Sequence, residues 1–84
     1  MRPSPGVSWI VETTGVTLLY RDGVRLSIPY PSAALWALVA NGNYEKGFAT
    51  ELVSILRTTG RREAEEDVEQ TLAGWIRAGL VTAD

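Results

Sequence analysis

The residues of this chain that could do chemistry are carboxylates gathered in its last third. Five acids lie close together there: Glu63, Glu65, Glu66, Asp67 and Glu69. Acid–base catalysis needs paired carboxyl groups in a desolvated cleft, whereas this pattern places them on the solvated face and at the dipole-favoured start of a helix. The sequence has no cysteine and no histidine, which argues against a zinc site or a serine-type triad. We therefore expect a binding module, not an enzyme, with no cofactor and no metal.

Length and charge narrow the class of protein further. The 84 residues fit one domain over 1–84, in which residues 1–6, with two prolines and a glycine, form a flexible lead-in. The net charge of −2 gives no general attraction to nucleic acid or anionic lipid. No apolar run approaches the roughly 20 residues of a membrane span, and no secretory signal is evident. These features predict a cytoplasmic protein without a nucleic-acid or membrane partner.

Three short strands are predicted in the first third of the chain. Ser8–Glu12 and Val16–Tyr20 are rich in β-branched and aromatic residues, and Val24–Ile28 alternates between apolar and polar residues. The alternation places three side chains of the third strand toward the core: Val24, Leu26 and Ile28.

The predicted turns decide which side chains share that core face. Asp22-Gly23 predicts a two-residue type I′ turn, which would put Leu19 opposite Leu26. Leu18 and Tyr20 would then lie on the other face, covered by a loop or the N-terminal tail, or free to contact a partner protein.

The first turn, at Thr13–Gly15, leaves two alternatives open. A two-residue loop places Ile10 on the core face, and a three-residue loop places Trp9 and Val11 there.

Three helices are predicted after the strands. The first covers about Ser32–Ala40, between Pro31 and the helix-ending Asn41-Gly42. The second covers about Glu45–Thr58 and the third about Glu63–Ala78. Three strands followed by three helices indicate an α+β fold of the winged-helix-turn-helix type, in which the last helix does the recognising.

Two of these helices carry a clear apolar face. The stripe of the second helix consists of Phe48, Leu52, Ile55 and Leu56. The inner face of the third helix consists of Ala64, Val68, Thr71, Leu72, Trp75 and Ile76. Arg61 and Arg62 are expected just before the third helix, where positive charge opposes the helix dipole.

Two helical segments, in this order, resemble those of the PqqD-like proteins, the leader-recognition modules of ribosomally made peptide natural products. Ser32–Val39, with the sequence SAALWALV, is similar to that family's first helix, and Asp67–Val81, DVEQTLAGWIRAGLV, to its closing helix. The likeness covers nearly the whole chain. The sequence departs from the family at Pro29-Tyr30, where Leu-Asn is usual, at Thr71, which replaces an aromatic residue, and at Trp75, which replaces a leucine.

The resemblance implies that a leader peptide docks as an antiparallel strand against Val24–Ile28. Its side chains would enter a groove between that strand and the last helix, where Arg25 and Asp67 read charged leader residues. The peptide-binding residues predicted in this way are Val24, Arg25, Leu26, Ser27, Ile28, Ala64, Asp67, Val68, Thr71 and Trp75. For Val68, Thr71 and Trp75, a role as ordinary core residues is the alternative.

The resemblance also implies two partners. One is the precursor's leader peptide, and the other is a separate modifying enzyme or leader peptidase, such as a radical SAM enzyme, a lasso-peptide protease or a cyclodehydratase. An alternative for the third strand is an edge blunted by Arg25 and the following proline to prevent aggregation.

The runner-up function is that of a winged-helix DNA-binding transcription regulator. It requires a basic recognition surface, but only Arg61, Arg62 and Arg77 are basic in or beside the last helix. A third possibility is a dimerising structural module that uses the face of Leu18 and Tyr20.

Overall fold

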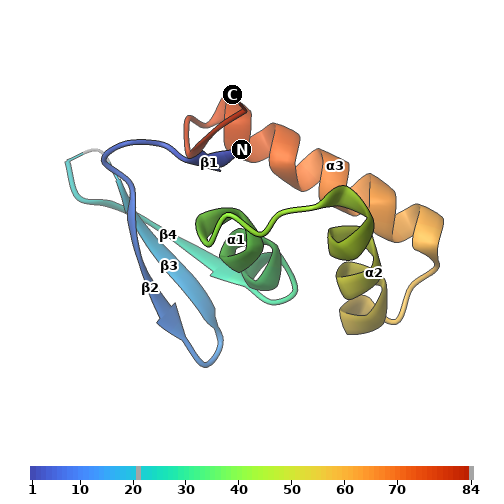
Figure 1. Ribbon diagram of the computed structural model, residues 1–84. Helices are drawn as coiled ribbons and strands as arrows, with labels where there is room; N and C mark the ends of the chain where they lie inside the picture. The colour runs from blue at the N-terminus through green and yellow to red at the C-terminus, as the bar shows by residue number, and fades with distance from the viewer. Residues whose placement is uncertain (21, 84) are drawn as a thin grey trace.

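The chain folds as a three-stranded antiparallel sheet followed by three helices, which confirms the predicted α+β architecture (Figure 1). The computed structural model describes residues 1–20 and 22–83. The strands of the sheet, in spatial order, are β2 (Ser8–Glu12), β3 (Gly15–Tyr20) and β4 (Val24–Pro29). The helices are α1 (Ser32–Ala40), α2 (Lys46–Arg57) and α3 (Arg61–Arg77).

A second, two-stranded sheet brings the first and last described residues together. β1 (Arg2–Pro3) pairs antiparallel with β5 (Val81–Thr82), and the Ser4 N–H donates to the Leu80 carbonyl at 2.9 Å. The segment expected to be a flexible lead-in therefore includes a strand. A two-residue strand whose partner lies almost a full chain length away leaves no periodic signal in the sequence.

The pairing between β3 and β4 differs by one residue from the predicted register. Tyr20 pairs with Val24 and Leu18 pairs with Leu26, so the prediction that Leu19 lies opposite Leu26 is wrong. Because side chains alternate along a strand, a shift of one residue exchanges the two faces of β3. Leu18, predicted on the outer face, is instead fully buried in the core.

The cause of this shift is the length of the turn. Asp22 and Gly23 do adopt positive φ angles, 50° and 85°. The pairing nevertheless closes at Tyr20 and Val24, so the loop has three positions rather than two; residue 21 lies outside the described residues. A turn motif thus identifies the hairpin without fixing which residues close it.

The first hairpin has the shorter of the two predicted loops, because Glu12 pairs with Gly15. Trp9 and Val11, not Ile10, nevertheless share the core face, since their partners on β3 belong to the face that turns inward. The prediction that a two-residue loop places Ile10 on the core face is wrong, because it assumed that the opposite face of β3 turns toward the core.

The helix α1 covers the core face of the sheet and contacts β3, β4 and α2. Leu35, Trp36 and Val39 of this helix are buried. The Trp36 ring meets the Trp9 ring edge-to-face, with centroids 5.7 Å apart, and the Trp75 ring likewise at 5.3 Å. These ring contacts join β2, α1 and α3 into one core.

The helix α2 has defined caps at both ends. The Glu45 carboxylate accepts hydrogen bonds from the N–H groups of Gly47 (3.1 Å) and Phe48 (2.8 Å), as expected of an acidic N-cap side chain. Thr58, with φ 55°, ends the helix in the left-handed conformation.

The buried face of α2 is not the apolar stripe that its sequence suggests. The residues that pack inward are Ala49, Thr50 and Val53, whereas Phe48 and Ile55 of the stripe are exposed. The apolar arc of this helix is wide, and the side with small residues is the one that meets α1 and α3. Periodicity alone does not reveal which part of such an arc is covered.

The helix α3 begins earlier than predicted. Its N-cap is Gly60, so Arg61 and Arg62 lie in the first turn instead of before it. Arg62 approaches Glu66 one turn later at 3.7 Å, and an exposed ion pair of this kind contributes at most about 0.5 kcal/mol. At the other end Ile76, predicted on the inner face, is 39% exposed.

Candidate functional site

The strand β4 lies at an edge of the sheet, and Pro29 fixes which of its backbone groups face outward. Pro29 pairs with Gly15. Because proline has no N–H, this pair cannot exchange both ladder hydrogen bonds and must be a non-hydrogen-bonded pair. The two kinds of pair alternate, so the main-chain groups of Arg25 and Ser27 point away from β3, and those of Leu26 point toward it. Among residues 1–20 and 22–83, no strand pairs with this outer edge.

The core face of β4 is covered at only one end. Ile28 is 6% exposed, but Leu26 and Val24 are 37% and 48% exposed, although all three side chains lie on the same face. Leu18, directly opposite Leu26, is fully buried. An apolar strip therefore runs along the free edge of β4 beyond the cover of the helices.

A small pocket lies just beyond the end of β4. Its volume is about 90 Å³. The residues around it come from all three helices and the segment before α1: Pro31, Ser32, Leu35, Val53, Arg57, Asp67, Val68, Gln70 and Thr71. Leu35, Val53 and Val68 are buried, so the pocket has an apolar floor below a rim of polar side chains. Such a cavity suits one small or branched side chain of a ligand.

The pocket brings together three of the predicted helix residues, Asp67, Val68 and Thr71. Asp67, expected to read a charged ligand residue, accepts a hydrogen bond from Arg57 and forms an ion pair with it. Both side chains stay partly exposed, with 35% and 44% of their surface accessible. A charged ligand group at the pocket rim could therefore replace one member of the Arg57–Asp67 ion pair as the partner of the other.

Two other predicted helix residues belong to the core of the free chain. Ala64 has no exposed surface, and Trp75 is 8% exposed with its ring against Trp36. On β4, the side chains of Arg25 and Ser27 are exposed and lie on the face opposite Leu26. These two residues can therefore contribute main-chain groups at the edge, while their side chains lie away from the pocket.

Sequence reasoning missed the part of the pocket that α1 and α2 provide. Ser32, Leu35, Val53 and Arg57 line it together with Gln70 of α3. Only Arg57 carried a usable signal, because a basic residue in the last turn of the second helix can reach an acid on the next one. The other contributions depend on how the helices pack.

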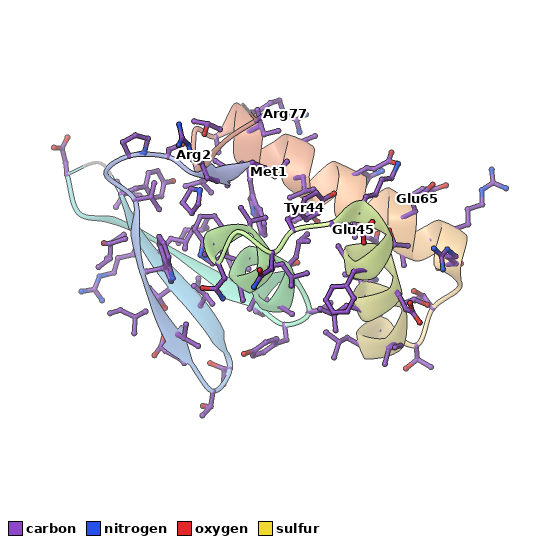
Figure 2. The ribbon with its side chains drawn as sticks, viewed as in Figure 1. Met1, Arg2, Tyr44, Glu45, Glu65 and Arg77 are labelled. Carbon is purple, nitrogen blue, oxygen red and sulfur yellow. The ribbon has the colours of Figure 1, made fainter. Side chains whose placement is uncertain are left out.

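Acidic side chains outnumber basic ones on α3, which carries five carboxylates and three arginines. Glu63, Glu65, Glu66 and Glu69 are all exposed, and Glu65 projects away from the body of the chain (Figure 2). Glu69 accepts a 3.3 Å ion-pair contact from Lys46 of α2, and this hydrogen-bonded contact raises the pKa of the Lys46 ammonium. This surface is unlike the basic recognition helix of a DNA-binding protein.

The described part of the chain holds neither a cluster of metal-ligating side chains nor a membrane-spanning helix. Within residues 1–20 and 22–83, no three metal-ligating side chains of the His, Cys, Asp or Glu types come together. In the same residues, no helix is both long and apolar enough to pass through a bilayer.

Comparison with known proteins gives one strong structural likeness. No protein-family model matches the sequence, and no curated protein matches it. A solved structure, described as TbiB1 in complex with the TbiA(β) leader peptide, superimposes with a TM-score of 0.85. The likeness covers 100% of this chain and 98% of that one, at 16% sequence identity. At this identity the likeness establishes a shared fold.

Proposed function

We propose that this chain is a non-catalytic binding protein for the leader segment of a ribosomally made precursor peptide. The leader adds to β4 as an antiparallel strand, and the chain presents the bound precursor to a separate modifying enzyme or leader peptidase. The observation that carries this proposal is the free edge of β4, beside which Val24 and Leu26 are 48% and 37% exposed on the core face of the sheet. An open edge with an uncovered apolar strip suits strand addition.

The backbone of β4 supplies the part of binding that tolerates different sequences. The outward N–H and C=O groups of Arg25 and Ser27 pair with the main chain of the leader, as the next strand of a sheet would. Every second leader side chain then lies on the core face, over Val24 and Leu26. Ile28 takes part through its place in the strand, because its side chain is already buried.

The wall of α3 supplies the selective part. Asp67 and Thr71 stand at the rim of the pocket and Val68 at its floor, while Ala64 and Trp75 hold this wall in place from the core. An apolar leader side chain that becomes fully buried there contributes roughly 1.5–3 kcal/mol. A charged leader residue can compete for the Arg57–Asp67 pair.

The structural neighbour supports this proposal. A protein of the same fold has been solved with a leader peptide bound. The resemblance of the helix sequences to PqqD-like proteins points in the same direction, although no family model matches the chain. The enzyme that receives the precursor is proposed to be of the radical SAM, lasso-protease or cyclodehydratase type.

A pair of proline variants tests strand addition at β4. Ser27→Pro removes an outward N–H of β4 and keeps the bonds to β3. The matched control is Val11→Pro on β2, at the opposite edge of the sheet. Leu18 directs its main-chain N–H and C=O groups to Leu26, so those of its other partner, Trp9, point outward from β2. By alternation along the strand, the main-chain groups of Val11 also point outward. Candidate leader peptides, taken from short open reading frames in the same genome, are labelled with fluorescein and titrated by anisotropy.

We expect Ser27→Pro to weaken leader binding by about tenfold or more, since one main-chain hydrogen bond and the fit of the added strand are lost. Val11→Pro should bind as the unmodified chain does. Circular dichroism checks that both variants fold. Equal affinity of a folded Ser27→Pro variant and the unmodified chain would contradict strand addition at β4, and a loss confined to Val11→Pro would move the site to β2.

A further inference from the structure

A row of exposed apolar side chains runs along α2 and takes no part in the proposed leader site. It consists of Phe48, Leu52, Ile55 and Leu56, and is called the α2 stripe below. Phe48, Ile55 and Leu56 are 54%, 68% and 48% exposed, and Leu52 is half-buried. Single exposed apolar residues are common, but a contiguous row of large ones on one helix face marks an interaction surface.

The α2 stripe faces away from the leader site. With about 100° of rotation per residue, its centre lies roughly 120–160° around the helix from Val53 and Arg57, which line the pocket. The helix itself contacts α1 and α3, and α1 separates it from the sheet (Figure 1). A partner on the α2 stripe therefore leaves the edge of β4 free, and both surfaces can be occupied at once.

The charges beside the α2 stripe are negative. Glu51 lies one residue before Leu52 and is exposed, and Glu45 caps the start of the helix about one turn before Phe48. Hydrogen bonds from the Phe48 and Gly47 N–H groups lower the pKa of the Glu45 carboxyl, which keeps it ionised. Lys46, on the other side, is held in its ion pair with Glu69. A complementary partner carries an apolar ridge flanked by basic residues.

This arrangement disfavours a second copy of the chain packed antiparallel on the α2 stripe. In that form of two-fold contact, the same helix of the two copies pairs with itself in opposite directions. The midpoint of the α2 stripe is Leu52, so self-pairing brings the two Glu51 carboxylates together near the axis. Like charges facing each other at the centre of a contact oppose association.

We propose that the α2 stripe docks an amphipathic helix of a partner protein whose apolar ridge is flanked by lysine or arginine. The inference rests on the proposed function only for the identity of that partner, which is the enzyme that receives the leader. The docking itself depends on α2 alone. One face of the module then holds the peptide while another holds the enzyme that acts on it.

A model helix tests the docking directly. The probe is a fluorescein-labelled amphipathic peptide of about 14 leucine and lysine residues, compared with the same peptide carrying glutamate for lysine. We expect the lysine helix to bind the intact chain, and Ile55→Gln to weaken it by about tenfold. The matched control Ile76→Gln removes an isoleucine from the exposed part of α3, 39% accessible, and should change binding by less than about twofold.

Charge variants test the chemistry of the partner. Glu51→Lys should weaken the lysine helix and strengthen the glutamate helix. Glu63→Lys makes the same change of charge on α3, outside the α2 stripe, and should affect the two probes far less. Equal binding of the two probes to the unmodified chain would refute the proposed partner chemistry.

Four further outcomes overturn or separate the proposals. Equal losses for Ile55→Gln and Ile76→Gln would show non-specific adhesion and refute the docking site. Sedimentation should give a monomer; a dimer dissolved by Ile55→Gln would assign the α2 stripe to a second copy and refute the proposal. Ile55→Gln should still bind the leader. A chain that binds the lysine helix through the α2 stripe but binds no leader refutes the proposed function alone, and the reverse result refutes the docking alone.

Discussion

Replacing Leu26 by alanine separates the binding role of this side chain from its structural role. Leu26 is 37% exposed, so of the roughly 1.5–3 kcal/mol for burying a leucine, about 0.6–1.1 kcal/mol is gained only when a peptide covers it. Leu26→Ala should therefore weaken leader binding by about threefold to sixfold. The part already buried against the core accounts for a further loss of about 1–2 kcal/mol in the free energy of unfolding.

Val16→Ala provides the control for this prediction. Val16 is 3% exposed on the neighbouring strand, so its truncation should cost about 1–2 kcal/mol of stability and leave affinity within about twofold. Anisotropy titration gives the two affinities, and urea unfolding gives the two stabilities. Unchanged leader binding by Leu26→Ala would show that no peptide covers the core face of β4. An equal loss of affinity in Val16→Ala would show that destabilisation alone explains the effect.

Three further predictions concern stability, pH and nucleic acid. A Cβ at Gly15 would lie 2.1 Å from the Ile28 carbonyl oxygen, so Gly15→Ala should lower the free energy of unfolding by about 3 kcal/mol, measured in urea; a loss below about 0.5 kcal/mol would contradict this packing. Glu45 has a pKa below its ordinary 4.5, because the Phe48 and Gly47 N–H groups bond its charged form. Its cap therefore stabilises the fold above that pH and is lost as the pH falls through the lowered value. The stability gap between the unmodified chain and Glu45→Gln should narrow in acid, and a gap that is constant with pH would refute the role of the charge. Finally, an electrophoretic mobility-shift assay at low salt should show no tight binding of duplex DNA, and tight binding would revive the winged-helix regulator.

The order and type of the main elements are predictable from the sequence, because their signals are local. The strand segments are β-branched and aromatic, and the helices are bounded by Pro31, Gly42 and Gly60. The helix starts are less certain. The third helix was predicted to begin at about Glu63, with Arg61 and Arg62 just before it, whereas α3 begins at Arg61.

The faces of the elements are harder to predict, because they depend on tertiary contacts. One extra residue in the loop before Val24 exchanged the faces of β3 and moved Leu18 from the predicted outer face to the centre of the core. In α2, the large Phe48, Ile55 and Leu56 of the apolar arc stay exposed, while the smaller Ala49 and Val53 pack inward. Neither outcome follows from periodicity, because the alternation along β3 and the apolar arc of α2 are the same whichever face is buried.

In the candidate site, too, some residues are predictable from the sequence and others are not. The strip on β4 and three α3 residues, Asp67, Val68 and Thr71, follow from motif order and resemblance. The contributions of Ser32, Leu35 and Val53 to the pocket follow only from the packing of α1 and α2 against α3. A groove shared by several elements is defined by their mutual placement, which local sequence does not encode.

Hydrogen exchange at the edges of the sheet tests the central claim most directly. The backbone N–H groups of Arg25 and Ser27 point outward from β4 in the free chain, and those of Trp9 and Val11 point outward from β2. With leader peptide at saturation, NMR-detected exchange should slow at Arg25 and Ser27 and stay unchanged at Trp9 and Val11, because only β4 gains a neighbouring strand. Saturating leader that leaves Arg25 and Ser27 exchanging at their free rates would contradict the account.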